Sequence, residues 1–229
     1  MFDKENSRYE IKFITHDTNY YLLKNWIRIN DLVLSKEYDN RKINNIYFDT
    51  HNYTAYKSNI YGNSSRLKIR YRWYGNFFDN NLGNLEFKIK RNVYGHKVRF
   101  PIENLKINKE INWKNIILKI NQNLSAEYKN IFNSQCVPMI INKYEREYYK
   151  SKNQKVRVTI DKDIYNYDQR RNIIKPNLDN KTFSQKYLVI EIKFDRSHKK
   201  FFENFSINTA IKLSKNSKYI NGVRAVTGI

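Results

Sequence analysis

Hydrophobic and polar residues alternate with a period of two along much of this chain. Such alternation is typical of β-strands with one buried face, because successive side chains of a strand point to opposite sides. It predicts eight strands in 229 residues. They cover about residues 8–14, 43–48, 66–74, 84–91, 96–102, 140–150, 155–163 and 187–195.

Helical spacing separates some of these strands. Asp17 or Thr18 is expected to cap a helix that runs to Ile29, with apolar residues three or four positions apart. Residues 164–186 are polar and are expected to form an excursion or a mobile loop. Shorter helices are predicted at residues 113–120, 125–132 and 199–205.

The predicted elements belong to one domain of the α+β class that spans residues 1–229. Six glycines and three prolines leave no stretch with the composition of a linker. Eight antiparallel strands are enough to close into a barrel, and closure removes exposed sheet edges.

Like charges gather on one face of the strand predicted at 66–74. Residues i and i+2 of a strand share a face about 6.6 Å apart, and a row of like charges is destabilising unless an anion lies against it. One interpretation is a solvated sheet face. If the apolar faces pack against helices, the simpler architecture is a tunnel lined by the basic faces. The cations of this strand face are Arg66, Lys68, Arg70 and Arg72.

The charge of the whole chain points the same way. Forty-three Lys and Arg against 22 Asp and Glu give a formal net charge of +21, which favours a polyanionic partner. A generally basic composition, rich in Asn, Lys, Ile and Tyr, is the alternative explanation. Cys136 is the single cysteine, so a disulfide framework is excluded and a reducing cytoplasm is expected. The polar start of the chain and the lack of a long apolar run predict membrane contact only through a partner protein.

Three glutamates stand two residues before a lysine on the same predicted strand face: Glu10, Glu86 and Glu191. They are either charge partners in a basic cavity or ligands of Mg²⁺ or Mn²⁺, which take carboxylate and phosphate oxygens together. Motifs for a P-loop, a dinucleotide fold or a zinc protease are absent from the sequence. The four histidines are scattered, and tyrosine-rich segments are interpreted as core rather than as base-stacking platforms.

Eight segments, in order along the chain, resemble the VTC domain, the polyphosphate-polymerising branch of the triphosphate tunnel metalloenzymes. The resemblance implies an eight-stranded tunnel that binds ATP and inorganic polyphosphate, transfers the γ-phosphate to the chain end and uses Mn²⁺ or Mg²⁺. A specific nucleic acid is not expected as a partner. The segments are residues 8–13, 46–50, 70–75, 85–88, 143–149, 156–161, 189–193 and 217–223.

The resemblance also implies site residues at matching positions. Glu191 is the expected metal ligand with Glu10 beside it, and Tyr144 is an expected hydrogen-bond donor to phosphate. Lys193 is a further expected site residue. The expected catalytic residues are Lys12, Arg70, Arg72 and Lys88, and the expected phosphate ligands are Lys97, Arg146, Arg157, Lys215 and Lys218.

The sequence departs from related patterns at its start. Hydrolytic tunnel enzymes begin with Glu-x-Glu-x-Lys, whereas Arg8 replaces the first glutamate here, which favours the VTC branch. The phosphate-sensing SPX domain and the membrane helices of eukaryotic VTC proteins are lacking, so a free-standing catalytic domain is expected. Two alternatives stay open: a tunnel hydrolase of triphosphate or polyphosphate, and a non-catalytic binder of polyphosphate or nucleic acid.

Overall fold

The computed structural model describes residues 9–78, 82–92, 94–182, 186–195 and 212–228. The chain forms two compact units, which are described separately. The first unit comprises residues 1–41, 144–164 and 184–216, and the second comprises residues 42–143, 165–183 and 217–229. The expected helix at 199–205, together with Arg8 and His198, lies outside the described residues.

All eight predicted strands are confirmed, and every strand pair whose register is known is antiparallel. They are β1 (Tyr9–His16), β2 (Leu34–Asp49), β3 (Ser65–Tyr74), β4 (Leu82–Arg91), β5 (Tyr94–Glu103), β6 (Val137–Ser151), β7 (Val156–Asp168) and β9 (Tyr187–Phe194). Two short strands join them within the described residues, β8 (Lys181–Thr182) and β10 (Lys212–Leu213). The strand order is β10-β1-β9-β7-β6-β2-β3-β4-β5, with β8 on β7. This path has two ends among the described residues, so its ladder is antiparallel but not strictly closed.

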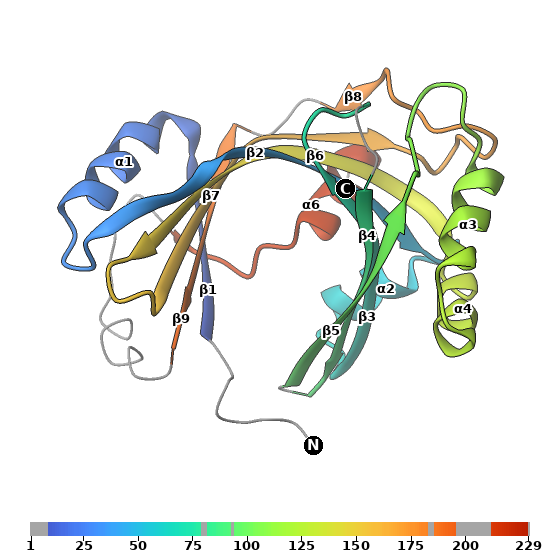
Figure 1. Ribbon diagram of the computed structural model, residues 1–229, viewed down its shortest axis with the longest axis horizontal. Coiled ribbons are helices and arrows are strands. Elements are labelled where there is room, and N and C mark those ends of the chain that lie inside the picture. The colour runs from blue at the N-terminus through green and yellow to red at the C-terminus, as the bar shows by residue number, and fades with distance from the viewer. Residues whose placement is uncertain (1–8, 79–81, 93, 183–185, 196–211, 229) are drawn as a thin grey trace. The chain divides into compact units, whose positions relative to one another are not determined.

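In the first unit, helix α1 (Tyr20–Ile29) covers the apolar side chains of β1, β9 and β7 (Figure 1). Leu23 and Ile27 are buried against a core that includes Ile190 of β9. The helix begins later than the predicted cap at Asp17 or Thr18, because residues 17–19 form a 3-10 turn, η1 (Asp17–Asn19).

In the second unit, the apolar face of β3 packs against two helices, as the alternation predicts. Ile69, Tyr71 and Trp73 are fully buried in a core shared with α3 (Trp113–Gln122) and α4 (Ala126–Asn133). Figure 1 shows both helices on the same side of the β3–β4–β5 ladder. The charged side chains of β3 therefore lie on the opposite face of the ladder.

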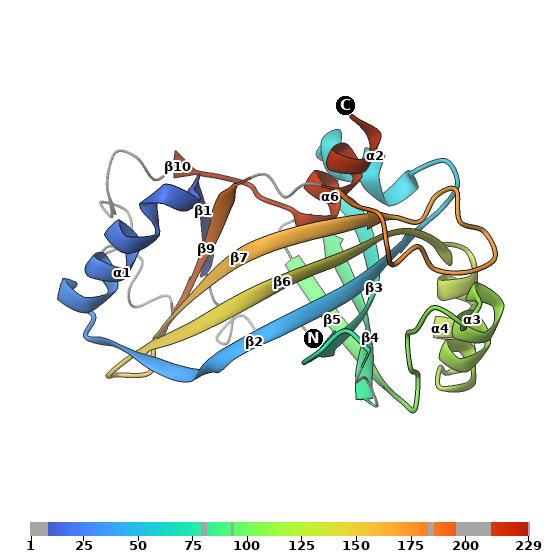
Figure 2. The same ribbon diagram turned by 90° about the horizontal axis from the view of Figure 1, so that it is seen from above.

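Two helices of the second unit have no counterpart among the predicted elements. Helix α2 (Thr54–Ile60) is capped by Asp49, whose carboxylate accepts from the backbone N–H groups of Ala55 at 2.8 Å and Tyr56 at 3.0 Å. Helix α6 (Lys218–Thr227) lies beside α2 (Figure 2), and its Tyr219 hydroxyl donates to the same carboxylate at 2.6 Å. A Cβ at Gly222 would collide with the Ile140 side chain of β6, so this glycine allows α6 to approach the sheet closely.

The segment 164–186 corrects the expectation of a polar loop throughout. Strand β7 continues to Asp168, and β8 pairs with it at Asn166 and Tyr167. Between these strands, the Gln169 side chain donates to the Asn177 carbonyl at 2.8 Å and accepts from the Asn177 N–H at 2.7 Å. Within the described part of the chain, each helix is too short or too polar to span a bilayer.

Candidate functional site

The charged face of the β3–β4–β5 ladder gathers cations from three strands. Antiparallel register places Lys68 opposite Lys88, and Lys88 opposite Lys97. One step along the ladder, Glu86 lies between Arg70 of β3 and Arg99 of β5. We call the basic cluster the eight residues Lys68, Arg70, Arg72, Glu86, Lys88, Lys97, Arg99 and Lys218.

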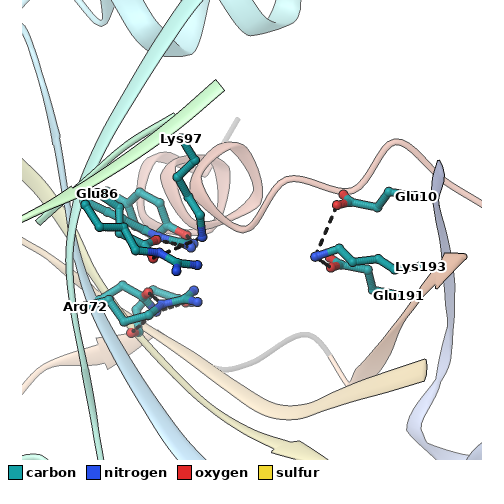
Figure 3. A network of polar contacts seen from close by, with 11 residues as sticks. Glu10, Arg72, Glu86, Lys97, Glu191 and Lys193 are labelled. Atoms are coloured by element: carbon teal, nitrogen blue, oxygen red, sulfur yellow. Dashed lines mark hydrogen bonds and ion pairs between the residues drawn. The ribbon is translucent and has the colours of Figure 1, made fainter. Parts of the chain in front are cut away.

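Glu86 holds three of these cations at once. One carboxylate oxygen accepts from Arg70 Nε at 2.6 Å and Arg70 Nη2 at 2.5 Å, and the other lies 3.2 Å from Lys97 Nζ and 3.1 Å from Arg99 Nε (Figure 3). Burial would raise the pKa of Glu86, but Arg70, Arg72 and Lys97 outweigh it and lower the pKa to about 2. Burial, aided by the charges of Arg70 and Arg99, lowers the pKa of Lys97 to about 8 although Glu86 opposes the shift.

Arg72 has a neutral hydrogen-bond partner as well as the electrostatic influence of Glu86. Its Nε donates to Asn45 Oδ1 at 2.8 Å, and the Asn45 amide donates to the carbonyl and side-chain oxygens of Asn142, each at 3.4 Å. Asn142 in turn donates to Asn166 Oδ1 at 2.9 Å. This row of buried amides orients the guanidinium without cancelling its charge.

Helix α6 adds its N-terminal residues to the same unit. Lys68 Nζ donates to Ser217 Oγ at 3.1 Å, directly before Lys218. The phenol of Tyr47 accepts from Arg70 Nη1 at 3.3 Å and lies in the field of Lys218. The expected site residues Arg70, Arg72, Lys88, Lys97 and Lys218 thus belong to one unit, with four of them on one ladder face.

The expected site residues of the first unit form a second group, built around a ring of two lysines and two glutamates on β1 and β9. Lys12 Nζ lies 2.8 Å from Glu10 and 3.5 Å from Glu191. Figure 3 shows Lys193 between the same two glutamates, and its Nζ lies 2.7 Å from Glu191 and 3.5 Å from Glu10. Burial would raise the pKa of Glu191, but Lys193, Lys12 and Arg146 hold it well below its usual range. The Glu191 carboxylate is therefore ionised at neutral pH.

Arginines extend this group along β6 and β7. Arg146 makes a two-pronged bond to the fully buried Asp161, at 2.5 and 2.8 Å, and lies over the Tyr144 ring at 5.5 Å. Arg157 contacts the two carboxylate oxygens of Glu37 at 3.2 and 3.3 Å. The name paired cluster is used for these four cations together with the four carboxylates that contact them. The cations are Lys12, Lys193, Arg146 and Arg157, and the carboxylates are those of Glu10, Glu191, Asp161 and Glu37.

Lys215 is exposed in the segment that follows β10. This segment runs beside β1, because Ser214 N–H donates to the Lys12 carbonyl at 2.8 Å and Lys12 Nζ lies 3.5 Å from the Asn216 carbonyl. The backbone thus brings Lys215 near the lysine–glutamate ring of the paired cluster.

The two clusters differ in charge balance. The basic cluster, as defined, has seven cations and one carboxylate, whereas the paired cluster has four of each. Uncompensated positive charge attracts polyanions, while a cation already paired must exchange its carboxylate for a phosphate. The basic cluster therefore has the charge excess that an anion site requires, and the paired cluster as defined does not.

A comparison with protein families decides the relationship that the sequence motifs suggested. The model of the family described as VTC domain matches residues 7–227. The chain belongs to the VTC domain family. The match includes all the residues of both clusters, and a comparison of this VTC chain with curated proteins finds no match.

One of two similar solved structures supports the fold of this VTC chain. A candidate adenylyl cyclase from Hippeastrum, HpAC1, described as having a dominant triphosphatase activity, is similar with a TM-score of 0.52 and 14% identity, over 97% of this chain and 96% of that chain. A candidate adenylate cyclase from Vibrio parahaemolyticus matches with a TM-score of 0.43 and 11% identity, over 85% and 82% of the two chains, a score that carries no argument. The first similarity concerns the fold alone and confirms the expected α+β triphosphate tunnel class.

Glu10 and Glu191 suit a divalent metal that also binds phosphate. The described residues contain no group of three or more His, Cys, Asp or Glu that could form a complete protein cage. Mg²⁺ and similar ions commonly bind through one or two carboxylates plus substrate phosphates. The carboxylates of Glu10 and Glu191 share both lysines, so they lie close together and fit that mode.

Several site residues were not assigned from sequence. Asn45 and Tyr47 on β2 contact two of the expected arginines, and Asp161 and Glu37 hold two others. A pairing register of β2 with β3 would have revealed the first two, since it sets Asn45 opposite Arg72 and Tyr47 opposite Arg70. Alternation within one strand contains no such information.

Proposed function

We propose that this chain is a polyphosphate polymerase, which transfers the γ-phosphate of ATP to the end of an inorganic polyphosphate chain. A terminal oxygen of the acceptor chain attacks the γ-phosphorus, the bond to the β–γ bridging oxygen breaks, and ADP leaves with that oxygen. The observation that carries the proposal is the excess of seven cations over one carboxylate in the basic cluster of a VTC chain.

Phosphoryl transfer needs positioning and charge stabilisation more than covalent chemistry from the protein. Arg70 and Lys97 are fixed by Glu86, and Arg72 is fixed by Asn45, so their donors are preorganised for phosphate oxygens. No protein nucleophile is required, which agrees with the scattered histidines and the single half-buried Cys136.

Glu191 and Glu10 are the residues that would hold Mg²⁺ or Mn²⁺ in the proposal. When bound, such an ion neutralises charge on the phosphate oxygens of the nucleotide. Lys12 and Lys193 then exchange carboxylate contacts for phosphate contacts, and Arg146 stays fixed by Asp161.

Hydrolysis is the second candidate, because the Hippeastrum protein of similar fold is described as having a dominant triphosphatase activity. Water would replace the polyphosphate end as the acceptor, and the phosphate ligands would be the same. We favour the polymerase because the family match covers nearly the whole chain, whereas the structural similarity has 14% identity.

Product analysis tests the proposal. The purified chain is incubated with ATP and Mn²⁺ or Mg²⁺, with and without a short polyphosphate primer, and the products are resolved on a gel. A ladder of lengthening polyphosphate with release of ADP is expected. Free phosphate without a ladder would establish the hydrolase, and absence of turnover with tight polyphosphate binding would establish a binder.

Glu191→Gln separates catalysis from binding. Turnover should fall at least tenfold, while polyphosphate binding without metal should stay equal or tighten because one negative charge is lost. Glu110→Gln is the matched control, since Glu110 is exposed and pairs with Lys175 at 3.3 Å in the second unit. Equal turnover of the Glu191→Gln variant and its parent would refute the metal-binding role.

A further inference from the structure

Tyr47 is a buried tyrosine among the cations of the basic cluster. It pairs with Arg70 in the β2–β3 register, so both side chains leave the same face of the sheet. The phenol oxygen accepts a hydrogen bond from Arg70 Nη1 at 3.3 Å. The side chain belongs to neither expected set of ligands, and its residue is only 5% exposed.

The ring of Tyr47 is fixed in place. It stacks on Tyr219 with a centroid distance of 5.4 Å and an interplanar angle of 27°. Tyr219 is itself tied to Asp49 by its hydroxyl at 2.6 Å. A hydroxyl on such a ring is preorganised, because little rotational freedom is lost when it binds a ligand.

The electrostatic surroundings of the hydroxyl are those of an anion site. Burial would raise the pKa of the Tyr47 phenol, but Arg70, Arg72 and Lys218 lower it below its ordinary value. A phosphate oxygen bound by Arg70 would lie beside this hydroxyl, because Arg70 Nη1 is 3.3 Å from the phenol oxygen. Because the phenol oxygen already accepts from Arg70, the hydroxyl hydrogen is available to another acceptor, and among the described residues the hydroxyl donates to none.

We propose that Tyr47 is a further phosphate ligand, whose hydroxyl donates a hydrogen bond to a non-bridging phosphate oxygen held by Arg70, Arg72 and Lys218. The inference rests on the proposed function, since it requires a phosphate chain at the basic cluster. A neutral donor adds directionality to a site that otherwise attracts anions through charge. Tyr47 therefore selects the position of one phosphate group and leaves the number of neutralised charges unchanged.

The test compares tripolyphosphate binding to the purified parent and the Tyr47→Phe variant by calorimetry over a range of salt concentrations. The variant keeps the stacked ring and loses only the hydroxyl. We expect the dissociation constant to rise about tenfold, as for loss of a hydrogen bond to a charged group. The slope of binding against salt should not change, because the number of phosphate–cation contacts is the same.

Tyr53→Phe is the matched control. Its hydroxyl also accepts from an arginine, Arg170 Nη1 at 3.2 Å in the same unit, but that arginine pairs with Asp168. This control should bind tripolyphosphate like the parent. Equal binding by the Tyr47→Phe variant and the parent would overturn the inference alone, and a parent that does not bind tripolyphosphate would overturn the proposed function as well.

A second measurement uses the parent chain and does not depend on the variant's stability. With tyrosines labelled at ¹³Cζ, the phenol in the field of the three cations should ionise at lower pH than an ordinary tyrosine. Added tripolyphosphate should move that ionisation upward, since an anion beside the hydroxyl disfavours the phenolate. An unchanged titration in the presence of saturating tripolyphosphate would overturn the inference.

Discussion

The Glu86→Gln substitution separates two effects of Glu86 on the basic cluster: its negative charge and its role in orienting the neighbouring cations. The carboxylate is 5% exposed and receives Arg70, Lys97 and Arg99 at 2.5 to 3.2 Å. Glutamine keeps the size of the side chain and one acceptor oxygen but leaves three cations without their shared negative charge. Anion affinity and catalytic rate should therefore change in opposite directions.

The magnitudes follow from burial and distance. Loss of one partner in a buried ion pair costs about 3–5 kcal/mol. The side chains of Lys97 and Arg99 are 35% and 59% exposed, so solvent screens part of this cost and we expect the free energy of unfolding to fall by about 2–3 kcal/mol. One additional net positive charge should tighten tripolyphosphate binding about tenfold and steepen its salt dependence by about one unit.

Turnover should fall by about 10- to 100-fold, because the Arg70 guanidinium loses the charge-assisted contacts to one Glu86 oxygen that orient it. Calorimetry with tripolyphosphate, thermal unfolding and the ATP-dependent product ladder measure the three quantities. Glu110→Gln makes the same chemical change at an exposed position and should leave all three unchanged. Weaker or unchanged tripolyphosphate binding by the Glu86→Gln variant would refute the view that this carboxylate restrains the anion affinity of the cluster.

Three further predictions concern single side chains. The pKa of Lys97 is lowered to about 8, so this lysine loses its charge and tripolyphosphate affinity should decrease as the pH rises through 8. Calorimetry at pH 7 to 9.5 measures the decrease, and Lys97→Arg should abolish it because arginine stays charged. Asn45→Leu removes the acceptor that lies 2.8 Å from Arg72 Nε, so it should lower the free energy of unfolding by about 1–3 kcal/mol and weaken tripolyphosphate binding severalfold. An unchanged melting temperature would contradict the role of Asn45 in orienting Arg72. In the first unit, burial would raise the pKa of Glu147, but hydrogen bonds from Tyr149, Tyr20, Lys162 and Lys24 lower it from 4.5 to about 2. Glu147 therefore stabilises the folded state above pH 4.5, and this stabilisation is lost as the pH falls toward 2. Glu147→Gln should therefore lower the free energy of unfolding at pH 7 by about 3 kcal/mol and flatten its acid dependence in urea titrations, while an equally steep acid dependence would refute the assignment.

The strands could be predicted because their two faces have opposite character over long stretches. In β3, buried Ile69, Tyr71 and Trp73 alternate with the cations, and the period of two leaves no alternative element. The helices α2 and α6 could not be predicted from the sequence pattern. Helix α2 has seven residues and depends on the Asp49 cap, and α6 contains Gly222 and β-branched residues that disfavour a helix in isolation.

The partners of the site residues were less predictable than the residues themselves. The sequence pairs Glu86 with Lys88, two positions along the strand, whereas the structure joins it to Arg70 across the ladder and to Lys97 and Arg99 of β5. Side chains two positions apart on a strand are about 6.6 Å apart, and directly opposite side chains on adjacent strands are about 5 Å apart. Glu86 is held across the ladder by Arg70 and Arg99, whereas Glu10 and Glu191 lie nearest the lysines two positions along their own strands, at 2.8 and 2.7 Å, with their cross-strand lysines at 3.5 Å. Both the spacing along a strand and the register between strands therefore decide the partners of these carboxylates.

The kind of partner, in addition to the excess of cations, distinguishes the two clusters. In the basic cluster, Arg72 donates to an amide and Lys68 to a hydroxyl, contacts that add no negative charge, while Arg70, Lys97 and Arg99 share the single carboxylate of Glu86. In the paired cluster, Arg146 and Arg157 are oriented by carboxylates, which hold them equally well but neutralise them. A neutral acceptor thus preserves the anion affinity of the cation that it positions, whereas a carboxylate lowers it. For this reason, substitutions in the basic cluster should dominate the affinity for a phosphate chain, and substitutions in the paired cluster should dominate the dependence on a divalent metal.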